Sequence, residues 1–237
     1  MNLKYDFHLH SCLSPCGDND MTPYNLVNMA KLMGYDIIAL TDHNSCLNCP
    51  AAIKAGEEAG ITVVPGMELC TAEEIHTVCL FPTLEKALEF SEYVKTTMPP
   101  VMNDESIFGN QYIMDHTDGI LGKEEILLTT ASGISIDDVV NEVSRFDGAV
   151  FPAHLDRASY SVLSVLGFMY PEMNFTAAGF THKAYIPQYE EKHELLKGMK
   201  HFRNSDAHYL ENMVEASVEI DLPECSAHAV VDYILNK

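Results

Sequence analysis

Histidines and carboxylates occur in this sequence at spacings that suit metal binding. His8 and His10 are two residues apart in a short apolar run of the kind that forms a strand, so both imidazoles project from the same side. Asp6 projects from that side too and could orient one of the rings. Two imidazoles on one face of a strand, beside a carboxylate, form a chelating pair for a divalent cation.

The same residue types follow four further predicted strands. The segments concerned are Thr41–His43, Pro65–Glu68, Pro152–His154 and Ser205–His208. A single histidine at a strand end is usually a hydrogen-bonded structural residue. Five such strand ends are different, because burying that many ionisable groups together without a cation would cost many kcal/mol. We therefore interpret the whole set as a metal site.

The mixture of imidazole and carboxylate narrows the choice of metal. Such sites suit zinc, manganese or iron, whereas magnesium and calcium favour sites made of oxygen alone. More than four candidate ligands indicate more than one ion, and a central carboxylate such as Glu68 can bridge two. Paired ions activate a water and stabilise an in-line displacement at phosphorus. The sequence therefore predicts several divalent ions and hydrolytic chemistry.

The elements that must carry these residues alternate along the chain. Apolar runs predict seven strands, at residues 5–10, 36–40, 61–65, 77–81, 149–153, 177–180 and 201–204. Helical spacing between them predicts helices, such as one that Thr22 and Pro23 open and Gly34 ends. Strands alternating with helices favour an α/β barrel, and in such barrels the chemistry collects at the C-terminal ends of the strands. We expect one domain over residues 1–237, with an incomplete or distorted barrel.

Residues from about 101 to 130 interrupt this alternation. Their pattern of apolar residues is weak, and the segment contains four acidic residues, Asp104, Glu105, Asp115 and Asp118. We interpret it as an irregular insertion. Our hypothesis is that it caps the site and shapes its specificity.

The charge of the chain limits its partners. It has 14 basic and 35 acidic side chains in 237 residues, and its net charge is -21. Such an acidic balance repels long nucleic acid and anionic lipid. No apolar run is long enough for a membrane span, and the N-terminus does not have the pattern of a signal peptide. Seven cysteines, an odd number, favour a reducing, cytoplasmic setting.

Taken in order, these motifs resemble those of the polymerase and histidinol phosphatase (PHP) family. The resemblance adds His76 and runs from near the first residue to about residue 210. It implies a distorted seven-stranded (β/α)7 barrel of the TIM type and a cluster of up to three metal ions. It also implies phosphoester hydrolysis, in which a hydroxide held between two ions attacks phosphorus.

The resemblance also implies which residues hold each ion. The first ion would be held by His8, His10, Glu68 and Asp206, the second by Glu68, His76 and His154, and the third by Asp18, His43 and His208. Asp18 is matched because the family motif Ser-Asp-Gly has a proline five residues after its aspartate, as Pro23 follows Asp18; Asp20 is the alternative. On this basis Glu68, Asp206 and His208 are the expected catalytic residues, and Asp42 supports the ligands.

His76 precedes its predicted strand, whereas the other candidate ligands follow theirs. This difference disappears if the strand at 77–81 starts at the edge where the preceding strand ends. We therefore expect those two strands to be antiparallel.

An anionic substrate needs hydrogen-bond donors besides the metal ions. Arg157, three residues after His154, could bind a phosphate through its planar guanidinium. Arg203 and Lys183 are the other two candidates, each close to a predicted strand end. The alternative for each of the three is a surface salt bridge.

Four cysteines raise a competing idea. Cys12 and Cys16 follow the first predicted strand, and Cys46 and Cys49 follow the second. Such thiols could hold a structural zinc or an iron–sulfur cluster, form a redox-sensitive pair, or simply pack as small apolar residues.

These observations predict a metal-dependent phosphoesterase with two to three manganese, zinc or iron ions. Its expected substrate is a small phosphorylated molecule, such as a nucleotide mono- or bisphosphate or the end of a short oligonucleotide. One alternative is an exonuclease acting on longer nucleic acid, which should show a basic groove. The others are an amidohydrolase-type enzyme, which typically adds a lysine ligand, and a metal-binding module without turnover.

Overall fold

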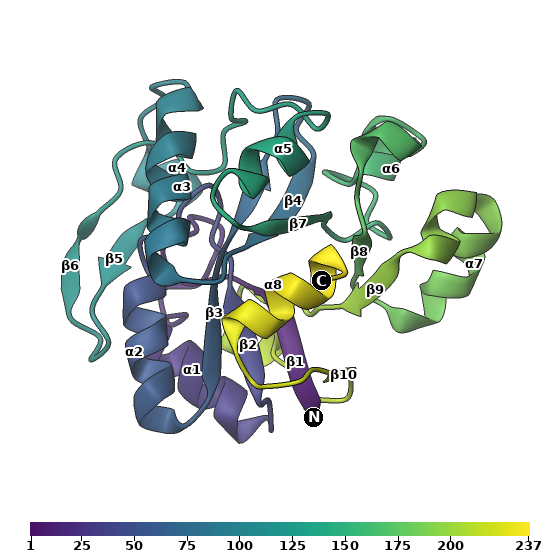
Figure 1. Cartoon of the computed structure of the whole chain (residues 1–237). Coiled ribbons are helices and arrows are strands. Elements are labelled where there is room, and N and C mark those ends of the chain that lie inside the picture. The colour runs from purple at the N-terminus through teal and green to yellow at the C-terminus, as the bar shows by residue number, and fades with distance from the viewer.

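A six-stranded mixed sheet organises the computed structural model, which describes all 237 residues (Figure 1). Its strands lie in the order β10-β1-β2-β3-β4-β7. Their bounds are β1 (Asn2–Leu9), β2 (Ile37–Leu40), β3 (Thr62–Cys70), β4 (His76–Leu80), β7 (Ala149–Pro152) and β10 (Glu219–Asp221). Two smaller sheets are the parallel pair β8 (Ala177–Phe180) and β9 (Lys200–Arg203) and the hairpin β5 (Tyr112–Met114) and β6 (Ile120–Lys123).

The central strands are buried on both faces, which explains their uninterrupted apolar sequence. In β2, Ile38 and Leu40 belong to the larger apolar core, together with side chains of α1 (Pro23–Leu32) and α2 (Cys49–Ala59). Ile37 and Ala39 belong to a second core that includes side chains of α8 (Ala227–Leu235). Helices therefore cover both faces of the sheet, as expected for an α/β fold (Figure 1).

The predicted helix signals are confirmed at both ends of α1. The side chain of Thr22 accepts a hydrogen bond from the backbone nitrogen of Asn25, and Pro23 is the first helical residue. The remaining helices are α3 (Leu84–Thr97), α4 (Glu105–Phe108), α5 (Val139–Ser144), α6 (Val162–Val165) and α7 (Ile186–Lys192). None of the helices has both the length and the apolar character that crossing a membrane requires.

The expected closed barrel of seven strands is not confirmed. The seven predicted strands all occur, but only five of them belong, with β10, to the main sheet. The sheet curls into a half-barrel, and β8 and β9 lie between its two ends. Leu155 beyond β7 donates its backbone N–H to Gly179 of β8, and a single bridge joins Leu9 of β1 to Ala207 beyond β9. These isolated contacts replace continuous strand pairing on that side.

Strand β1 pairs with residues from the last part of the chain. Residues Asn2–Lys4 pair antiparallel with Glu219–Asp221 of β10. Farther along β1, the carbonyl of His8 accepts a hydrogen bond from the backbone nitrogen of Asp206. The first strand is therefore flanked by β2 on one side and by residues from the last part of the chain on the other.

The segment 101–130 is more regular than expected, because it contains α4 and the β5–β6 hairpin. It packs on the loop that follows β1, where Tyr112 donates its backbone N–H to the carbonyl of Cys12 at 2.9 Å. Gly109 lies against the backbone of Pro15 in the same loop. No residue of the segment lines the cavities described below, so its role as a cap stays a prediction.

Candidate metal centre

The carboxylate of Glu68, in the second half of β3, lies at the centre of a histidine cluster. Its oxygens are 3.0–3.2 Å from one ring nitrogen of each of five histidines, His8, His10, His43, His76 and His154. Oε1 faces three of them and Oε2 the other two. Glu68 is only 1% exposed. A carboxylate with histidines at both oxygens is placed to bridge metal ions.

Asp206 completes a four-residue group with His8, His10 and Glu68, whose ligand atoms all lie within 4.8 Å of one another. Asp206 Oδ1 is 3.3 Å from His8 Nε2 and 3.2 Å from His10 Nε2. This oxygen is buried and has no hydrogen-bond partner. An unpaired buried carboxylate oxygen is costly, and a bound cation would remove that cost.

Two further groups adjoin the first, one of His43, Glu68 and His76 and the other of His10, His43 and His208. The Nδ1 atoms of His43 and His154 are buried without a hydrogen-bond partner. Zinc, manganese and iron are commonly bound by imidazole nitrogens and carboxylate oxygens. The residues present therefore fit a site for more than one divalent ion.

The antiparallel pairing of β3 and β4 delivers His76 to the cluster. Cys70 at the end of β3 pairs with His76 at the start of β4, as the expected antiparallel arrangement requires. The backbone nitrogen of His76 donates to the carbonyl of Tyr160 at 2.8 Å, and the two rings stack with centroids 4.6 Å apart. Tyr160 thus holds His76, a role that the sequence did not indicate.

Two of the cluster residues have strained backbones. His154 has φ of 28° and Asp206 has φ of 55°, in the left-handed region that residues with a Cβ rarely occupy. Each such residue costs about 1–3 kcal/mol and persists only where its surroundings hold it. One backbone hydrogen bond holds each of these turns. Asp206 donates its N–H to the carbonyl of His8, and Leu155, the residue after His154, donates its N–H to the carbonyl of Gly179.

Asp42 orients His10 through a serine. Ser14 Oγ donates to Asp42 Oδ1 at 2.7 Å and lies 3.0 Å from His10 Nδ1. With Nδ1 engaged in this way, His10 presents Nε2 to Glu68 and Asp206. Asp42 therefore supports a ligand, as expected.

Asp6 acts differently from the expectation that it orients an imidazole. Its carboxylate accepts hydrogen bonds from the backbone nitrogens of His8 at 3.2 Å and Ser205 at 3.1 Å. Burial raises the pKa of Asp6 to about 6, although these hydrogen bonds act in the opposite direction. Asp6 therefore ties β1 to the turn that carries Asp206.

The cluster keeps its two carboxylates ionised. Burial acts to raise the pKa of Glu68, but the charges of His76, His8 and His43 outweigh it and lower that pKa well below its usual value. The same balance of burial against His8 and His10 lowers the pKa of Asp206. Burial would lower the pKa of His10, yet the carboxylates of Asp206 and Glu68 beside its ring raise it to about 9. Cations of some kind, protons or metal ions, are thus held beside these carboxylates.

The structure brings eight of the nine expected ligands together and leaves out Asp18. The carboxylate of Asp18 accepts a hydrogen bond from the backbone nitrogen of Asp20 at 2.8 Å and belongs to none of the ligand groups. Cys16, in the same loop, also belongs to none of the ligand groups, although the charges of His43 and His208 act on its thiol. Burial acts to raise the pKa of this thiol, but the charge of His43 and hydrogen bonds with both imidazoles lower it to about 5.

Comparison with known families fits this geometry. The family model described as PHP domain matches residues 6–221. The chain belongs to the PHP domain family. Both the family and the buried cluster agree with the expectation of a metal-dependent hydrolase.

Similar proteins share the PHP fold with this chain. A 5'-3' exoribonuclease of Haemophilus influenzae is 37% identical over 83 residues, which are 34% of this chain and 29% of the exoribonuclease. The lesion-specific endonuclease Q of Pyrococcus furiosus superposes with a TM-score of 0.65 at 16% identity, over 100% of this chain and 56% of that protein. A structure from Bifidobacterium adolescentis, described as a metal-dependent phosphoesterase, superposes with a TM-score of 0.62 at 17% identity, over 98% of this chain and 95% of that protein. The chain thus spans about a third to a half of the first two.

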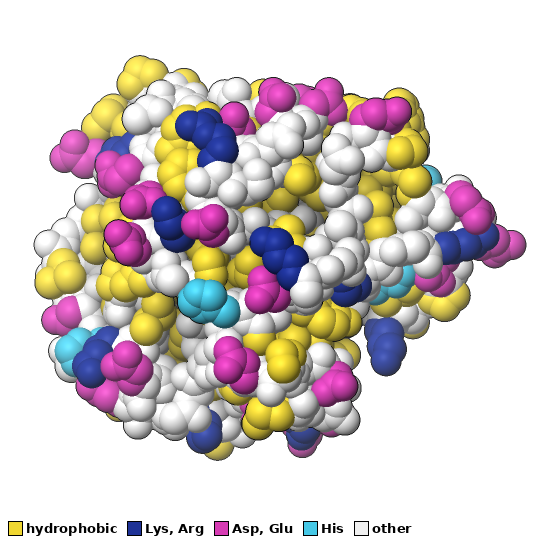
Figure 2. Space-filling model, viewed as in Figure 1, with side chains coloured by type: hydrophobic (Ala, Val, Ile, Leu, Met, Phe, Trp, Pro, Cys, Tyr) yellow, Lys and Arg dark blue, Asp and Glu magenta, His cyan; other side chains and the backbone are white.

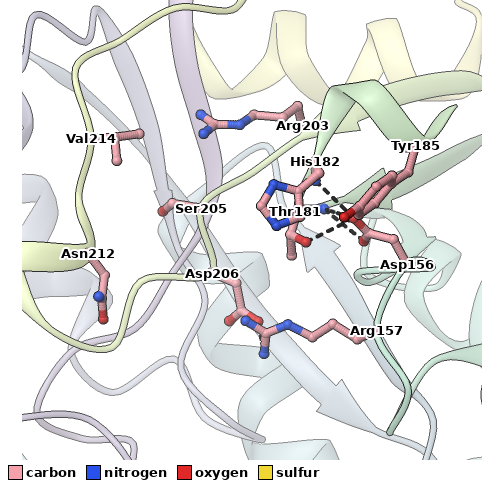
Figure 3. Close-up of a pocket in the computed structure, with 10 residues that line it drawn as sticks. All are labelled: Asp156, Arg157, Thr181, His182, Tyr185, Arg203, Ser205, Asp206, Asn212 and Val214. Carbon is pink, nitrogen blue, oxygen red and sulfur yellow. Dashed lines mark hydrogen bonds and ion pairs between the residues drawn. The ribbon is translucent and has the colours of Figure 1, made fainter.

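A cavity of about 210 Å³ opens over the candidate metal ligands of this PHP domain, and Arg157 and Tyr160 form part of its wall. It adjoins a polar cavity of about 600 Å³ (Figure 3). Arg157 and Asp206 line both cavities, and their side chains are joined by an ion pair of 2.7 Å. Arg203 also lines the larger cavity.

Lys183, the third expected phosphate donor, lines neither cavity. Its neighbours His182 and Tyr185 line the larger one instead. Asp156 fixes this wall, because its carboxylate accepts hydrogen bonds from the backbone nitrogens of Thr181 and His182, both at 2.9 Å (Figure 3). Asp156 lies two residues after His154. Its closeness to a candidate metal ligand was the feature of the sequence that could have indicated its role in this wall.

The four cysteines near the first two strand ends have different surroundings. Cys46 and Cys49 are buried in the larger core, and both thiols approach the carbonyl of Gly66. Cys12 is buried as well, whereas Cys16 is exposed. Packing explains the first three, whereas Cys16 lies at the surface.

Proposed function

We propose that this PHP domain is a metal-dependent phosphoesterase acting on small phosphorylated molecules. The observation that carries the proposal is the single buried carboxylate of Glu68, placed against five imidazoles. One ion would be held by His8, His10, Glu68 and Asp206, another by Glu68, His76 and His154, and a third with the help of His43 and His208. Divalent ions at such a site supply an activated water and neutralise charge developing on phosphate oxygens.

Arg157 is the residue best placed to bind the reacting phosphate. Its side chain is 46% exposed and lies between the two cavities, with Nη1 on Asp206 Oδ2. A guanidinium makes paired hydrogen bonds to phosphate as readily as to carboxylate. An ion that takes over Asp206 would leave Arg157 free to turn to the substrate.

The larger cavity would hold the part of the substrate that does not react. Arg203 and His182 offer it donors for a second anionic group, and Tyr185 offers an aromatic ring. A volume of about 600 Å³ suits a ligand of nucleotide size. We therefore favour a nucleotide mono- or bisphosphate, or the end of a short oligonucleotide.

Surface charge supports a small substrate. The net charge is -21, and Figure 2 shows Lys and Arg at isolated positions among acidic side chains on the face drawn. Of three arginines in the chain, two line the larger cavity and the third, Arg145, pairs with Glu142 elsewhere. A protein that follows long nucleic acid needs a continuous basic groove.

The second candidate is a nuclease. It is favoured by the identity to a 5'-3' exoribonuclease and by the structural similarity to an endonuclease. Those proteins are much longer than this chain, so the shared region is only part of each. The amidohydrolase alternative is less supported, because no lysine lines the cavity over the cluster.

The test combines metal analysis of the purified protein with manganese-supported hydrolysis of phosphate monoesters, diesters and oligonucleotides of increasing length. We expect at least one bound ion per chain and a kcat/KM that does not rise with oligonucleotide length. Less than one ion per chain, with neither ester class hydrolysed, contradicts the proposal. A preference for long, salt-sensitive substrates favours the nuclease.

A further inference from the structure

Tyr160 lies against His76 at the wall of the smaller cavity. The two rings are nearly parallel, with centroids 4.6 Å apart and planes inclined by 17°. Their backbones are joined as well, because the carbonyl of Tyr160 accepts a hydrogen bond of 2.8 Å from the nitrogen of His76. Tyr160 therefore contacts His76 both through the backbone and over one face of the imidazole.

No hydrogen bond orients the imidazole of His76. Its Nδ1 faces Glu68 Oε1 at 3.1 Å, and no protein atom forms a hydrogen bond with the other ring nitrogen, Nε2. Histidines that bind metal are usually oriented by a hydrogen bond at that second nitrogen. His10 has such a partner in Ser14. The ring of Tyr160 is placed to do for His76 what that hydrogen bond does for His10.

Burial does not replace the missing hydrogen bond. The side chains of His8, His43 and His154 are at most 6% exposed, so the surrounding side chains restrict their rings. The side chain of His76 is 12% exposed and borders the cavity. Its ring is inclined by 60° and 62° to those of His43 and His154, so the parallel face contact comes from Tyr160.

The backbone of Tyr160 is strained, although the residue is not buried. Its φ is 56°, in the left-handed region that bulky residues rarely occupy, and it is 48% exposed. Such strain persists only where the surroundings hold it, and it is concentrated at functional sites. Here Arg157 donates its N–H to the carbonyl of His154 at 2.9 Å, and Ser161 Oγ donates to the carbonyl of Arg157 at 3.0 Å. These bonds hold the turn that keeps an exposed ring on His76.

We propose that Tyr160 is a positioning residue for the second ion of the metal centre. Its ring would fix the imidazole of His76, which holds that ion together with Glu68 and His154 in the centre proposed above. The inference rests on that centre and goes beyond it, because Tyr160 acts through the face of its ring and not through an atom that binds metal. An imidazole that is already fixed loses less freedom on binding, so the affinity of this one position should depend on Tyr160.

Calorimetric titration of Mn²⁺ into the chelator-treated full-length chain tests this role without any substrate. Tyr160→Asn removes the ring, and asparagine tolerates a left-handed φ better than tyrosine. We expect the affinity of one ion position to fall by about tenfold or more, while the other positions keep theirs. Tyr160→Phe retains the ring and should retain the wild-type affinity at every position.

Tyr24→Asn is the matched control for the loss of a tyrosine. Tyr24 lies on α1, is 42% exposed and lines neither cavity. This variant should bind Mn²⁺ as wild type does.

A second measurement separates metal binding from stability. If Tyr160 only supported the fold, its loss would lower the Tm of the metal-free protein. We expect Tyr160→Asn to change that Tm by less than about 4 °C, because relief of the unfavourable φ offsets the lost ring contact. The increase in Tm that Mn²⁺ produces should be smaller in this variant than in wild type.

A larger fall in the Tm of metal-free Tyr160→Asn would move the titration to Tyr160→Leu. Leucine keeps the apolar bulk without a flat ring, and this variant should show the same loss at one ion position.

The outcomes separate this inference from the proposed function. An unchanged Mn²⁺ affinity in the variants without the ring, or an equal loss at every position, would overturn the role of Tyr160 and leave the phosphoesterase proposal standing. A loss in Tyr160→Phe as large as in Tyr160→Asn would also overturn it, because the hydroxyl would then be responsible. If one position weakens as expected but the wild type hydrolyses no phosphate ester, the role of Tyr160 stands and the proposed activity fails. A wild-type chain that binds no metal contradicts both proposals.

Discussion

At the scale of single residues, Glu68 differs from the other candidate ligands because its two oxygens contact histidines assigned to different ions in the proposed metal centre. A terminal ligand such as His154 would affect one position, whereas Glu68 affects several at once. The structure therefore predicts that substitutions around the cluster have unequal effects.

Glu68→Gln should remove more than one ion per chain, since an amide cannot supply two anionic oxygens. We expect metal affinity to fall by at least about 10–100-fold and turnover to fall at least as far. Metal content by mass spectrometry and hydrolysis rates would check this. Glu57→Gln, at an exposed pair with Lys54, is the control and should change neither quantity. Unaltered metal content in Glu68→Gln would contradict a bridging role.

The raised pKa of Asp6 predicts that the stability of the metal-free protein depends on pH. Its folded pKa of about 6 exceeds the ordinary value of 3.8 for an aspartate, so the folded state binds more protons than the unfolded state between these values. The contribution of Asp6 to the free energy of unfolding is therefore most favourable below about pH 4 and falls as pH rises to 6, by roughly 3 kcal/mol. Urea unfolding at pH 4–7 would show this loss in wild type and not in Asp6→Asn. Equal slopes for the two proteins would contradict it.

At the scale of elements, the insertion with the β5–β6 hairpin supports the loop that carries Cys16. Its contact with that loop depends on Gly109, which has φ of +100° and whose Cβ would meet the carbonyl oxygen of Pro15 at 2.2 Å. Any side chain there must displace backbone. The hairpin is thus coupled to the metal site although it lines no part of the cavity.

Gly109→Ala should lower the free energy of unfolding by about 1–3 kcal/mol, because it combines an unfavourable φ with a clash. Gly122→Ala in β6 is the matched control, since nothing lies within 4 Å of its Cβ position and its φ is ordinary. We expect it to change stability by less than about 0.5 kcal/mol. Denaturant titration of both variants measures the difference, and equal effects would contradict the close contact.

The elements differ in how far the sequence predicted them. The strands that carry ligands were predictable, because buried parallel strands such as β2 are short apolar runs. The hairpin and β10 were missed, since strands of three or four half-exposed residues have no clear periodicity. Closure of the barrel could not be decided from periodicity, which says nothing about whether the last strands complete a ladder.

The residues of the candidate site, like the elements, were predicted only in part. Residues at or directly after a strand end lie where that strand places them. Five histidines therefore meet Glu68, and Asp206 and His208 lie beside those histidines. Whether Asp18 reaches the cluster depends on a loop whose shape is set by contacts with His208 and with the insertion. Those contacts are long-range, so the spacing of the motif could not show that the carboxylate of Asp18 turns back to Asp20.

At the scale of the whole molecule, bound metal should contribute measurably to stability. An ion at 100 times its dissociation constant stabilises by about 2.7 kcal/mol, which for a chain of this length corresponds to about 5–10 °C in Tm. Removing metal with a chelator should therefore lower Tm by at least that amount, and adding Mn²⁺ or Zn²⁺ should restore it. The shift should be smaller in Asp206→Asn, and a chelator-insensitive Tm would contradict a metal-filled centre.

The pairing of β1 with the last part of the chain affects how the protein is made. During synthesis β1 leaves the ribosome about 200 residues before β10 and the turn around Asp206. At about 5–20 residues per second, β1 waits roughly 10–40 s for these partners. A nascent chain therefore exposes His8 and His10 without Asp206, and the candidate ligand set is complete only after His208 has been synthesised.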